Sequence, residues 1–354
     1  MISDNPKISI IIPVHNEGEN TIKVLESVKN ISYDNKELII VDDSDDIITR
    51  KLIEEWIERR VHSELHAKYL KFEKRLGVSR ARNKGMKQAS GEFIFLLDAD
   101  VVLKEEALLE ALRLLESDPK IGAISILYLH ENPSILEKIY ASRYIGRIKK
   151  GSLATGAMII PKGVTEIVGY FNECLGYPHQ VYEDWEYSVR INKMGFKTLI
   201  DGRAVLTHLP KATSMTAINN NISLYSILSR LKDYISSKRA EALFRVLLAG
   251  NLKLKLEYLL YAISSWVILL LPFISVIFNA SLLYKTVLFI IVYLTMWLIY
   301  YLCDFSFSKF REALLFMCFS LISRHIRALA LTLWFPVVII KLRRKCRSVS
   351  LNLL

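Results

Sequence analysis

Cysteine is scarce in this sequence, with only four in 354 residues, at positions 174, 303, 318 and 346. No two of them have the short spacing of a zinc site or of a redox-active pair, so both kinds of site are excluded. We therefore expect four reduced cysteines that serve as packing residues in a reducing compartment. We expect no signal peptide, because the apolar run at 8–14 is too short and polar residues follow it at once.

Acidic side chains are outnumbered by basic ones, and the formal net charge is +11. An excess of this kind favours an anionic partner, either nucleic acid or an acidic lipid surface. Five basic residues in the stretch 341–347 directly follow an apolar segment, which favours lipid. We expect a membrane lipid and no nucleic acid as partner, although charge alone leaves nucleic acid open as an alternative.

Only short apolar runs occur in the first 210 residues, and they alternate with amphipathic stretches. The runs have the length and the β-branched content of strands, whereas the stretches repeat apolar residues at three- and four-residue steps. This alternation predicts an α/β fold with a mainly parallel sheet covered by helices. We expect strands at 8–14, 37–43, 69–74, 92–98, 121–129 and 153–161, and helices at 18–30, 46–62, 78–89 and 104–116. The basic and aromatic stretch 133–152 is expected to be an excursion between strands.

Apolar residues dominate the last third of the chain. Residues 211–255 are expected to form amphipathic juxtamembrane helices, with an ordinary surface helix as the alternative. The segments 256–278 and 282–303 are long enough to span a bilayer and predict a transmembrane hairpin over 256–303. Residues 304–354 are expected to be a basic interfacial or re-entrant segment and a cytoplasmic tail, because Arg324, His325 and Arg327 would be costly at mid-bilayer. The chain is thus expected to be an integral membrane protein.

Aspartates stand at the ends of two predicted strands, Asp42 and Asp43 after one and Asp98 and Asp100 after another. Ligands of such sheets collect at the carboxyl ends of the strands. Two carboxylates separated by one residue can bind a divalent cation, which relieves their mutual repulsion. A strand that simply runs out into a polar loop is the alternative.

Five stretches carry a resemblance to a known family: ISIIIPVHNEGENTIKVLESV, ELIIVDDSDD, GVSRARNKGMKQASGEFIFLLDADV, TGAMIIPKGVTEIVGYFNE and YEDWEYSVRINKMGFKTLI. Their identity and order resemble those of family 2 glycosyltransferases, over roughly residues 6–210. The resemblance implies the GT-A fold, a nucleotide-binding α/β sandwich, as a catalytic domain at 1–210.

The resemblance also implies roles for individual residues. It places the nucleotide against Pro13, Val14, His15 and Glu17, with Asp43 reading the base and Arg82 and Asn83 along the diphosphate. It implies that Asp98 faces the ribose, that Asp100 holds Mg²⁺ or Mn²⁺, and that His208 approaches the metal. Asp184 matches the catalytic base, and the sugar and acceptor pocket is implied at Thr155, Gly156, Glu183 and Trp185.

Ordinary structural roles are the alternatives for several of these residues. Glu183 and Asp184 can cap a helix, because acidic residues suit a first helical turn. Arg82 can be a surface charge, and His208 a buried structural histidine.

The expected reaction is an inverting transfer of one sugar from a UDP- or GDP-linked donor to an acceptor, with a polyprenyl-linked saccharide at the cytoplasmic membrane face as the expected acceptor. The Gln-X-X-Arg-Trp motif of processive synthases is absent after His208, which favours transfer of a single sugar. A polyprenyl-phosphate hexose synthase is the enzymatic alternative. A catalytically idle membrane scaffold is the alternative from another class.

Overall fold

The computed structural model describes residues 5–59, 65–175 and 182–210, together with single residues between 243 and 336. The chain divides into two compact units, Met1–Asn219 and Asn220–Leu354. The helices and strands whose bounds are given below all belong to the first unit.

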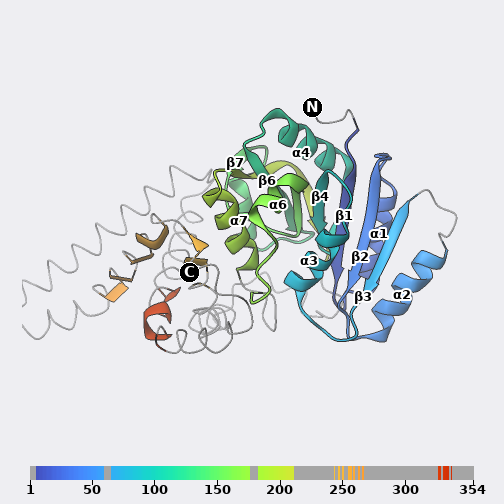
Figure 1. Ribbon diagram of the computed structural model, residues 1–354, viewed down its shortest axis with the longest axis horizontal. Helices are drawn as coiled ribbons and strands as arrows, with labels where there is room; N and C mark the ends of the chain where they lie inside the picture. The colour runs from blue at the N-terminus through green and yellow to red at the C-terminus, as the bar shows by residue number, and fades with distance from the viewer. Residues whose placement is uncertain are drawn as a thin grey trace, which may run out of the picture. The chain divides into compact units, whose positions relative to one another are not determined.

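The first unit begins with alternating strands and helices (Figure 1). In chain order these are β1 (Ile8–Val14), α1 (Glu19–Lys29), β2 (Lys36–Asp42), α2 (Ile47–Glu58), β3 (His66–Lys71), α3 (Val78–Gln88) and β4 (Phe93–Leu97). The four strands pair in the order β3-β2-β1-β4, and every pair is parallel. Helical crossovers impose this arrangement, because a parallel neighbour requires the chain to return to the starting edge. The expected strands and helices of this half are confirmed in type and order, but β3 lies three residues earlier than the expected strand 69–74 and α2 ends before residue 62.

The second half of the sheet is built differently. It contains β5 (Val101–Val102), α4 (Glu105–Ser117), β6 (Ile121–His130), α5 (Ile135–Ser142), β7 (Ile148–Lys150), β8 (Ala157–Pro161), α6 (Lys162–Val168), α7 (Glu183–Lys193) and β9 (Lys197–His208). The strand order continues β4-β8-β6-β9-β5, with β7 also paired to β9. β8 is antiparallel to both of its neighbours, and only β6 and β9 pair in parallel.

The expectation of a mainly parallel sheet is therefore wrong for this half, and the whole sheet is mixed. The physical reason lies in the excursion 133–152, which forms α5 and the three-residue β7. The chain reverses its direction within this excursion, because β7 runs antiparallel to β9 and β8 follows in the same direction, antiparallel to β6 and β4.

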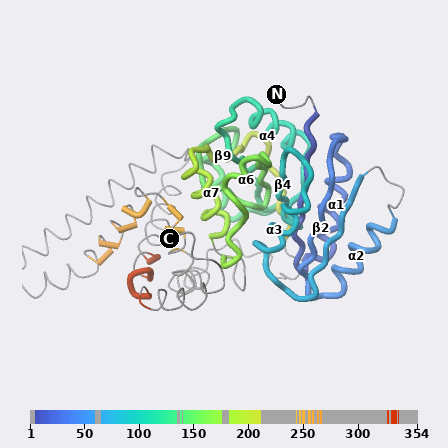
Figure 2. The backbone as a smooth tube through the Cα atoms, viewed as in Figure 1, coloured from blue at the N-terminus to red at the C-terminus, as the bar shows by residue number. Residues whose placement is uncertain are grey.

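Helices cover both faces of the sheet (Figures 1 and 2). Successive side chains of a strand point to opposite faces. Accordingly, Ile10 and Ile12 belong to a core with residues of α1, α2 and α4, whereas Ile11 belongs to a core with residues of α3, α6 and α7. The result is a three-layer sandwich with a hydrophobic core on each side of the sheet.

Close packing of α3 against the sheet positions one side of the site described below. A Cβ atom at Gly85 would clash with the side chain of Ile11, so glycine allows the helix to approach β1 closely. Arg82 lies one turn earlier on α3 and is buried with it. The packing of Gly85 thus fixes the position of a buried cation.

The segments predicted to contact the membrane fall outside most of the described residues. The structure describes the segments 211–255, 256–278 and 304–354 only at isolated residues and short runs, and the predicted span 282–303 lies outside the described residues. Within the part of the chain that the structure describes, no helix has the length and apolar character needed to cross a bilayer.

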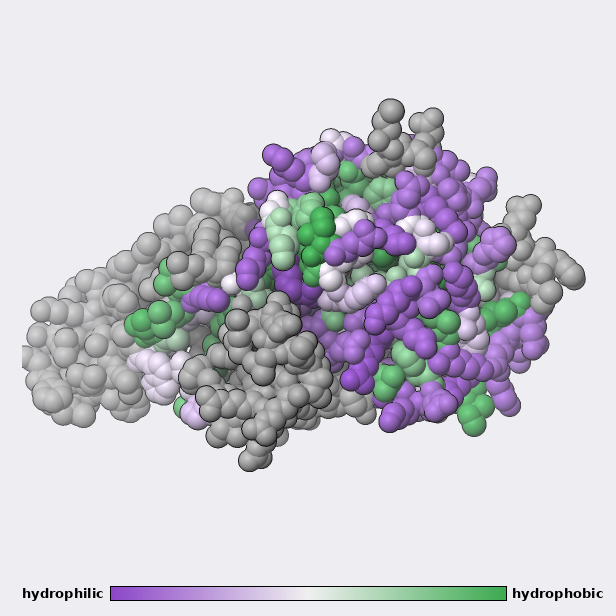
Figure 3. Space-filling model, in the orientation of Figure 1, coloured by the Kyte–Doolittle hydropathy of each residue, from purple (hydrophilic) through white to green (hydrophobic). Residues whose placement is uncertain are grey.

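The described surface of the first unit is largely hydrophilic on the face shown in Figure 3, with apolar residues gathered in small patches. Cys174 is unpaired, as expected, but it is exposed. Its expected role as a packing residue is wrong, because it follows Phe171 in a surface loop instead of lying in a strand or helix. The other three cysteines lie outside the described residues.

Candidate functional site

Three elements bring opposite charges together at the centre of the unit. Arg82 of α3 is 3% exposed, and its Nη2 donates to Oδ1 of Asp98, directly after β4, at 2.9 Å. Its Nη1 donates to Oε1 of Glu183, the first residue of α7, at 3.4 Å. Burial opposes the charge on Arg82, but the carboxylates around it outweigh that effect and raise the pKa of Arg82. A buried arginine with two acidic partners is a structural link between distant segments, and its alternative as a surface charge is wrong.

Asp100 is paired with His208 at the edge of the sheet. The carboxylate Oδ2 of Asp100 lies 3.0 Å from Nε2 of His208, and both side chains are mostly buried. The two residues meet because β5 follows Asp100 at once and pairs antiparallel with the end of β9, opposing Val101 to His208. Burial lowers the pKa of His208, but the hydrogen bond and charge of Asp100 outweigh burial, so the pKa of His208 lies above its ordinary value.

Asp184 lies beside these charges in the first turn of α7. One of its oxygens accepts a hydrogen bond from the backbone N–H of Trp185 at 2.7 Å. Burial and the adjacent Glu183 carboxylate together raise the pKa of Asp184 from 3.8 to about 7. A carboxyl group with a pKa near neutrality can exchange a proton at physiological pH, which is the property that a general base needs. Asp184 therefore fits both interpretations, since it lies in the first turn of a helix and also has a pKa that suits a general base.

Strain accompanies the start of α7. Tyr182 precedes the helix with φ of 63°, in the left-handed region that few residues other than glycine adopt. Its ring makes an edge-to-face contact with Trp185, with centroids 5.5 Å apart. Unusual backbone of this kind is often found where side chains are held for function. The half-buried Trp185 is thereby positioned next to Asp184.

At the other end of the site, Asp43 is held by backbone amides. It is buried, and its two oxygens accept from the N–H groups of Leu76 and Gly77 at 2.6 and 2.7 Å. Its own N–H donates to the carbonyl of Val14, at the end of β1. These bonds join the end of β1, the end of β2 and the start of α3. Pro13 is buried in β1 beside Val14, and the half-buried Glu17 follows in the loop before α1.

The ring of His15 is oriented by its contact with Asp43. Its Nδ1 lies 2.8 Å from the carbonyl oxygen of Asp43, which can only accept a hydrogen bond. Nδ1 is therefore the donor, and in the neutral form of the ring Nε2 is an acceptor. Among the residues that the structure describes, none is hydrogen-bonded to Nε2.

Asn83 has its side-chain amide fully engaged in a structural contact. The amide nitrogen donates to the carbonyl of Phe171 and to Glu173, and its oxygen accepts from the N–H of Phe171. Asn83 thus ties the loop after α6 to α3. Its expected contact with a nucleotide stays a prediction.

The predicted pocket residues Thr155 and Gly156 lie in the loop that leads into β8. Thr155 is buried, and the carbonyl of Gly156 accepts from the N–H of Asp98 at 2.9 Å. A Cβ atom at position 156 would lie 2.6 Å from Cζ and 2.7 Å from Oη of Tyr128. Only glycine lets this loop pass the tyrosine ring.

Two residues of the site were not found by sequence reasoning. Tyr128 packs edge-to-face on His208, with ring centroids 5.5 Å apart, and also contacts Gly156. His130 lies over His208 with centroids 4.1 Å apart, and its Nδ1 is 2.9 Å from Glu137 of α5. Both aromatic residues come from the end of β6. Because ligands collect at the carboxyl ends of strands, that position was the available signal.

The structure thus brings most of the predicted residues together in three groups. Arg82, Asp98, Glu183 and Asp184 form one group, and Asp100 and His208 form another. Asp43, His15 and Val14 meet at the ends of β1 and β2, which are neighbours in the sheet.

The residues fit a divalent cation with two protein ligands. Asp100 and His208 present one carboxylate and one imidazole at 3.0 Å, which are donors that Mn²⁺ and Mg²⁺ accept. Within the described part of the chain, no three His, Cys, Asp or Glu side chains form a complete metal cage. Such an incomplete set suits a cation that is shared with a substrate diphosphate, since Mg²⁺ commonly takes one or two carboxylates and completes its shell with phosphates.

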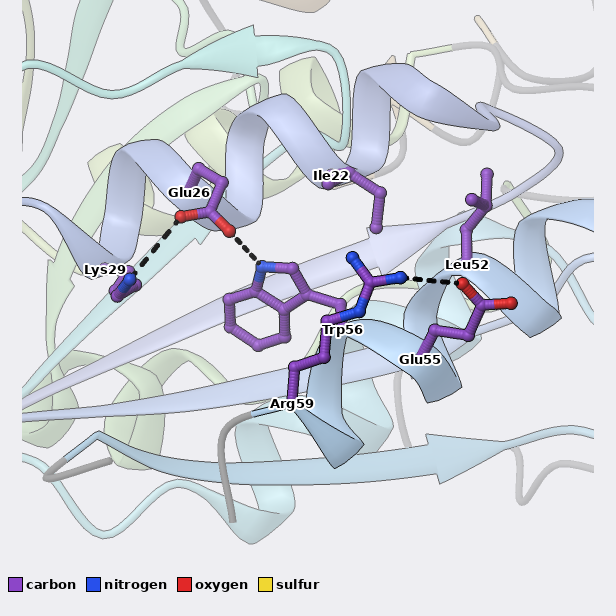
Figure 4. Close-up of a pocket in the computed structure, with 7 residues that line it drawn as sticks. All are labelled: Ile22, Glu26, Lys29, Leu52, Glu55, Trp56 and Arg59. Carbon is purple, nitrogen blue, oxygen red and sulfur yellow. Dashed lines mark hydrogen bonds and ion pairs between the residues drawn. The ribbon is translucent and has the colours of Figure 1, made fainter. Parts of the chain in front are cut away.

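A separate cavity between α1 and α2 has none of these residues in its lining (Figure 4). Its volume is about 250 Å³. Nε1 of Trp56 donates to Glu26 there at 2.8 Å, and Arg59 pairs with Glu55. The charged side chains around it are paired with one another or with the indole, so this cavity adds nothing to the site.

Comparison with known proteins agrees with this arrangement. Residues 9–161 match the family model described as "Glycosyl transferase family 2". The match spans less than half of the 354-residue chain. The matched residues contain Asp43, Arg82, Asp98 and Asp100, whereas Asp184 and His208 lie beyond them.

Curated relatives of the chain include two staphylococcal enzymes. The poly-β-1,6-N-acetyl-D-glucosamine synthase of Staphylococcus epidermidis is 29% identical over 210 residues, which cover 56% of this chain and 48% of the relative. The enzyme of the same name from Staphylococcus aureus strain COL is 27% identical over 202 residues, covering 54% and 47%. This chain therefore matches about half the length of these relatives.

Solved structures share the fold. The mannosyltransferase PcManGT from Pyrobaculum calidifontis, in complex with GDP-Man and Mn²⁺, aligns with a TM-score of 0.59 at 17% identity, over 92% of this chain and 88% of that chain. GalNAc-T7 with UDP, GalNAc and Mn²⁺ aligns with a TM-score of 0.50 at 18% identity, over 68% and 51%. The expected GT-A-like fold is confirmed.

Proposed function

We propose that the protein is an inverting glycosyltransferase that moves one sugar from a UDP- or GDP-linked donor to an acceptor hydroxyl. The observation that carries this proposal is the position of Asp184. Its side chain lies among the charges of Arg82, Glu183 and Asp98, and its pKa is raised. In the proposed step, Asp184 accepts the proton of the acceptor hydroxyl as its oxygen attacks the anomeric carbon. The bond from that carbon to the diphosphate breaks, and its electron pair leaves with the nucleotide.

The groups around Asp184 support this step. The link from Arg82 to Glu183 holds the first turn of α7 near Asp98. A Mg²⁺ or Mn²⁺ ion, held by Asp100 and His208 with Asp98 nearby, would neutralise charge that develops on the departing diphosphate. Both structural neighbours described above were solved with Mn²⁺, which makes that ion the first to test.

The base of the donor is proposed from the tautomer of His15. A neutral His15 with an acceptor at Nε2 suits a base edge that presents a ring N–H. Uracil and guanine carry such an N–H, whereas adenine and cytosine present acceptor nitrogens at the equivalent ring positions. Among the neighbours, PcManGT holds GDP-Man and GalNAc-T7 holds UDP, so the fold accommodates either base.

A polyprenyl-linked saccharide at the cytoplasmic face of a membrane is the proposed acceptor. The support comes from the sequence, because the apolar segments 256–278 and 282–303 follow the catalytic domain and the basic run 341–347 lies beyond them. The absence of a Gln-X-X-Arg-Trp motif after His208 supports transfer of a single sugar.

The proposal is tested by comparing the full chain with Asp184→Asn. A panel of UDP- and GDP-sugars is incubated with membrane lipid extract and Mn²⁺, and the glycolipid is identified by mass spectrometry. We expect the variant to lose about 10²–10⁴-fold in turnover, the usual contribution of a general base. Binding of UDP or GDP to the variant is expected to be unchanged.

The control is Asp118→Asn, which alters a partly exposed carboxylate paired with Lys197 and should leave turnover as it is. Equal turnover in wild type and Asp184→Asn would rule out the proposed base. Nucleotide binding without any turnover in the wild type would support the idle scaffold instead. Transfer to polyprenyl phosphate itself would identify a polyprenyl-phosphate hexose synthase.

A further inference from the structure

The excursion between β6 and β8 exposes large apolar side chains on a fixed turn. Tyr140 of α5 is 42% exposed, Ile145 in the following turn is 50% exposed and Ile148 of β7 is 37% exposed. We call these three residues, with Arg147 and Lys150, the α5–β7 surface. Exposed isoleucines three residues apart indicate a binding surface, because a partner that buries them removes apolar area from water.

The charge around these residues identifies the kind of partner. Residues 135–150 contain five basic side chains, Lys138, Arg143, Arg147, Lys149 and Lys150, and one acidic side chain, Glu137. Glu137 is occupied by His130, whose backbone N–H and Nδ1 both contact it. Isoleucine and tyrosine surrounded by basic residues are typical of segments that lie at the headgroup level of an anionic bilayer.

A second exposed apolar pair shows that exposed apolar residues are not always surrounded by basic ones. Ile47 and Ile48 at the start of α2 are 68% and 70% exposed. They follow Asp45 and Asp46, whose charge would be repelled by an anionic surface. The α5–β7 surface is less exposed but has the opposite charge.

Hydrogen bonds to β9 hold the turn that carries the α5–β7 surface. The N–H of Gly146 donates to the carbonyl of Gly202, and the N–H of Gly202 donates to the carbonyl of Arg147. β7 pairs with β9, and Tyr144 is buried against the protein. The apolar side chains therefore project from a rigid turn, so little conformational entropy is lost when they insert.

The surface also begins at the candidate site. Glu137 of α5 contacts His130, and the ring of His130 lies over His208, the partner of Asp100. We propose that the α5–β7 surface docks the catalytic domain onto an anionic bilayer and so holds the site at the level of lipid headgroups. This inference rests on the proposed function. It adds to that function a membrane contact made by the catalytic domain itself.

The test measures contact with lipid and does not depend on turnover. The four native cysteines of the full chain are replaced by serine, Ile148→Cys is introduced and labelled with an environment-sensitive fluorophore, and the protein is reconstituted in phosphatidylcholine vesicles with or without phosphatidylglycerol. A lipid with a nitroxide near its headgroup quenches a label that touches the membrane. We expect strong quenching with phosphatidylglycerol present and weak quenching without it.

Two comparisons make the test decisive. Ile47→Cys carries the same label at a more exposed but acidic position and should be quenched weakly in both kinds of vesicle. Arg147→Gln with Lys150→Gln should weaken the docked state by roughly 25-fold, since each basic residue near an anionic surface contributes about fivefold. Thermal unfolding of this double variant checks that it is folded.

The inference is overturned if the label at 148 is quenched no more than the label at 47. It is also overturned if that label is shielded equally in detergent and in both vesicles, which would assign the surface to another part of the chain. Neither result touches the proposed glycosyl transfer, whose failure would appear only as absent turnover.

Discussion

The two halves of the sheet treat their carboxylates in different ways. In the parallel half, Asp43 is bound by two backbone amides, whereas Asp42 accepts from Tyr69 and from the N–H of Ser44 and lies 3.5 Å from Nε of Arg50. In the mixed half, Asp98 and Asp100 are paired with other charged or titratable side chains, and Asp184 has a raised pKa. The difference teaches that the first half is built as a fixed support, whereas the second keeps its charges available for chemistry.

Neutral backbone donors explain how Asp43 is held in place. An amide N–H that bonds a buried carboxylate stabilises its charge without a titratable partner, so the arrangement does not change between mildly acidic and alkaline pH. A carboxylate that faces Arg82, His208 or another carboxylate is instead sensitive to every charge around it. Substitutions in the two halves should therefore have different consequences.

The largest effect is expected where the halves are joined. Arg82→Leu removes the cation between Asp98 and Glu183 and leaves carboxylates without their partner, because Arg82 is almost fully buried. We expect a loss of about 2–4 kcal/mol in the free energy of unfolding, reduced from the full value of a buried pair because Asp98 is one-third exposed. Chemical denaturation in detergent micelles measures it.

Arg80→Leu on the same helix is the matched control. Arg80 pairs with Glu173, and both side chains are more than 40% exposed. An exposed pair contributes at most about 1 kcal/mol, so a similar loss in both variants would show that Arg82 is no special link between the halves.

A smaller loss is expected from crowding in the mixed half. Gly156→Ala places a methyl group within 2.6 Å of the Tyr128 ring and should destabilise the protein by about 1–3 kcal/mol. Gly163→Ala, in α6 with no atom within 4 Å of its Cβ position, should be neutral or stabilising by about 0.5–1 kcal/mol. Adding Tyr128→Leu to Gly156→Ala should recover part of the loss in thermal unfolding, and no recovery would show that the clash is elsewhere.

The parallel half should respond to acid in its own way. Burial would raise the pKa of Glu37, but hydrogen bonds from Ser9, Ser90 and Lys68 outweigh it and hold the pKa at about 2. A lowered pKa means that the carboxylate stabilises the fold above its ordinary value of 4.5, and that this stability is lost as pH falls from 4.5 towards 2.

Glu37→Gln should therefore cost about 1–2 kcal/mol at neutral pH and flatten the acid dependence of stability. The exposed Glu54, which pairs with Lys71 at the surface, provides the control Glu54→Gln. Denaturation curves between pH 3 and pH 7 measure both. Identical acid dependence in wild type and Glu37→Gln would contradict the role given to Glu37.

Sequence reasoning was accurate where local pattern and chain crossover determine the structure. The strands ending at Asp42 and Leu97 follow from apolar runs, and a helix between them forces the carboxylates to the same edge of the sheet. In the second half it located α4, β6 and β8, but it did not find β5 and β7, because they have only two and three residues and leave no periodic signal.

The same limit applies to the site. The pairing of Asp100 with His208 depends on the two-residue β5, and the link from Arg82 to Glu183 joins residues that are far apart in the sequence. Family resemblance named these residues, but their contacts are tertiary. Tyr128 and His130 were not found, because a strand pattern does not distinguish an aromatic residue that packs in the core from one that borders a site.

The smallest expected effect concerns the acidic limb of the pH–activity profile, which is the range in which kcat/KM rises with pH. Burial is the first cause of the raised pKa of Asp184 and the charge of Glu183 is the second, so Glu183→Gln should lower that pKa by roughly one unit or less. A base acts when it is deprotonated, so kcat/KM of the wild type should rise as pH increases through about 7. In Glu183→Gln the same rise should occur at lower pH.

Stability should change in the opposite direction to activity. Because the folded protein raises the pKa of Asp184 above 3.8, its contribution to stability is complete below that value and is lost as pH rises through about 7. Asp184→Asn should remove this loss, so that its unfolding free energy falls less between pH 6 and pH 8 than that of the wild type. The exposed control Glu173→Gln should leave the acidic limb of activity where it is in the wild type. An acidic limb that does not shift in Glu183→Gln would show that Asp184 is not the group that limits activity.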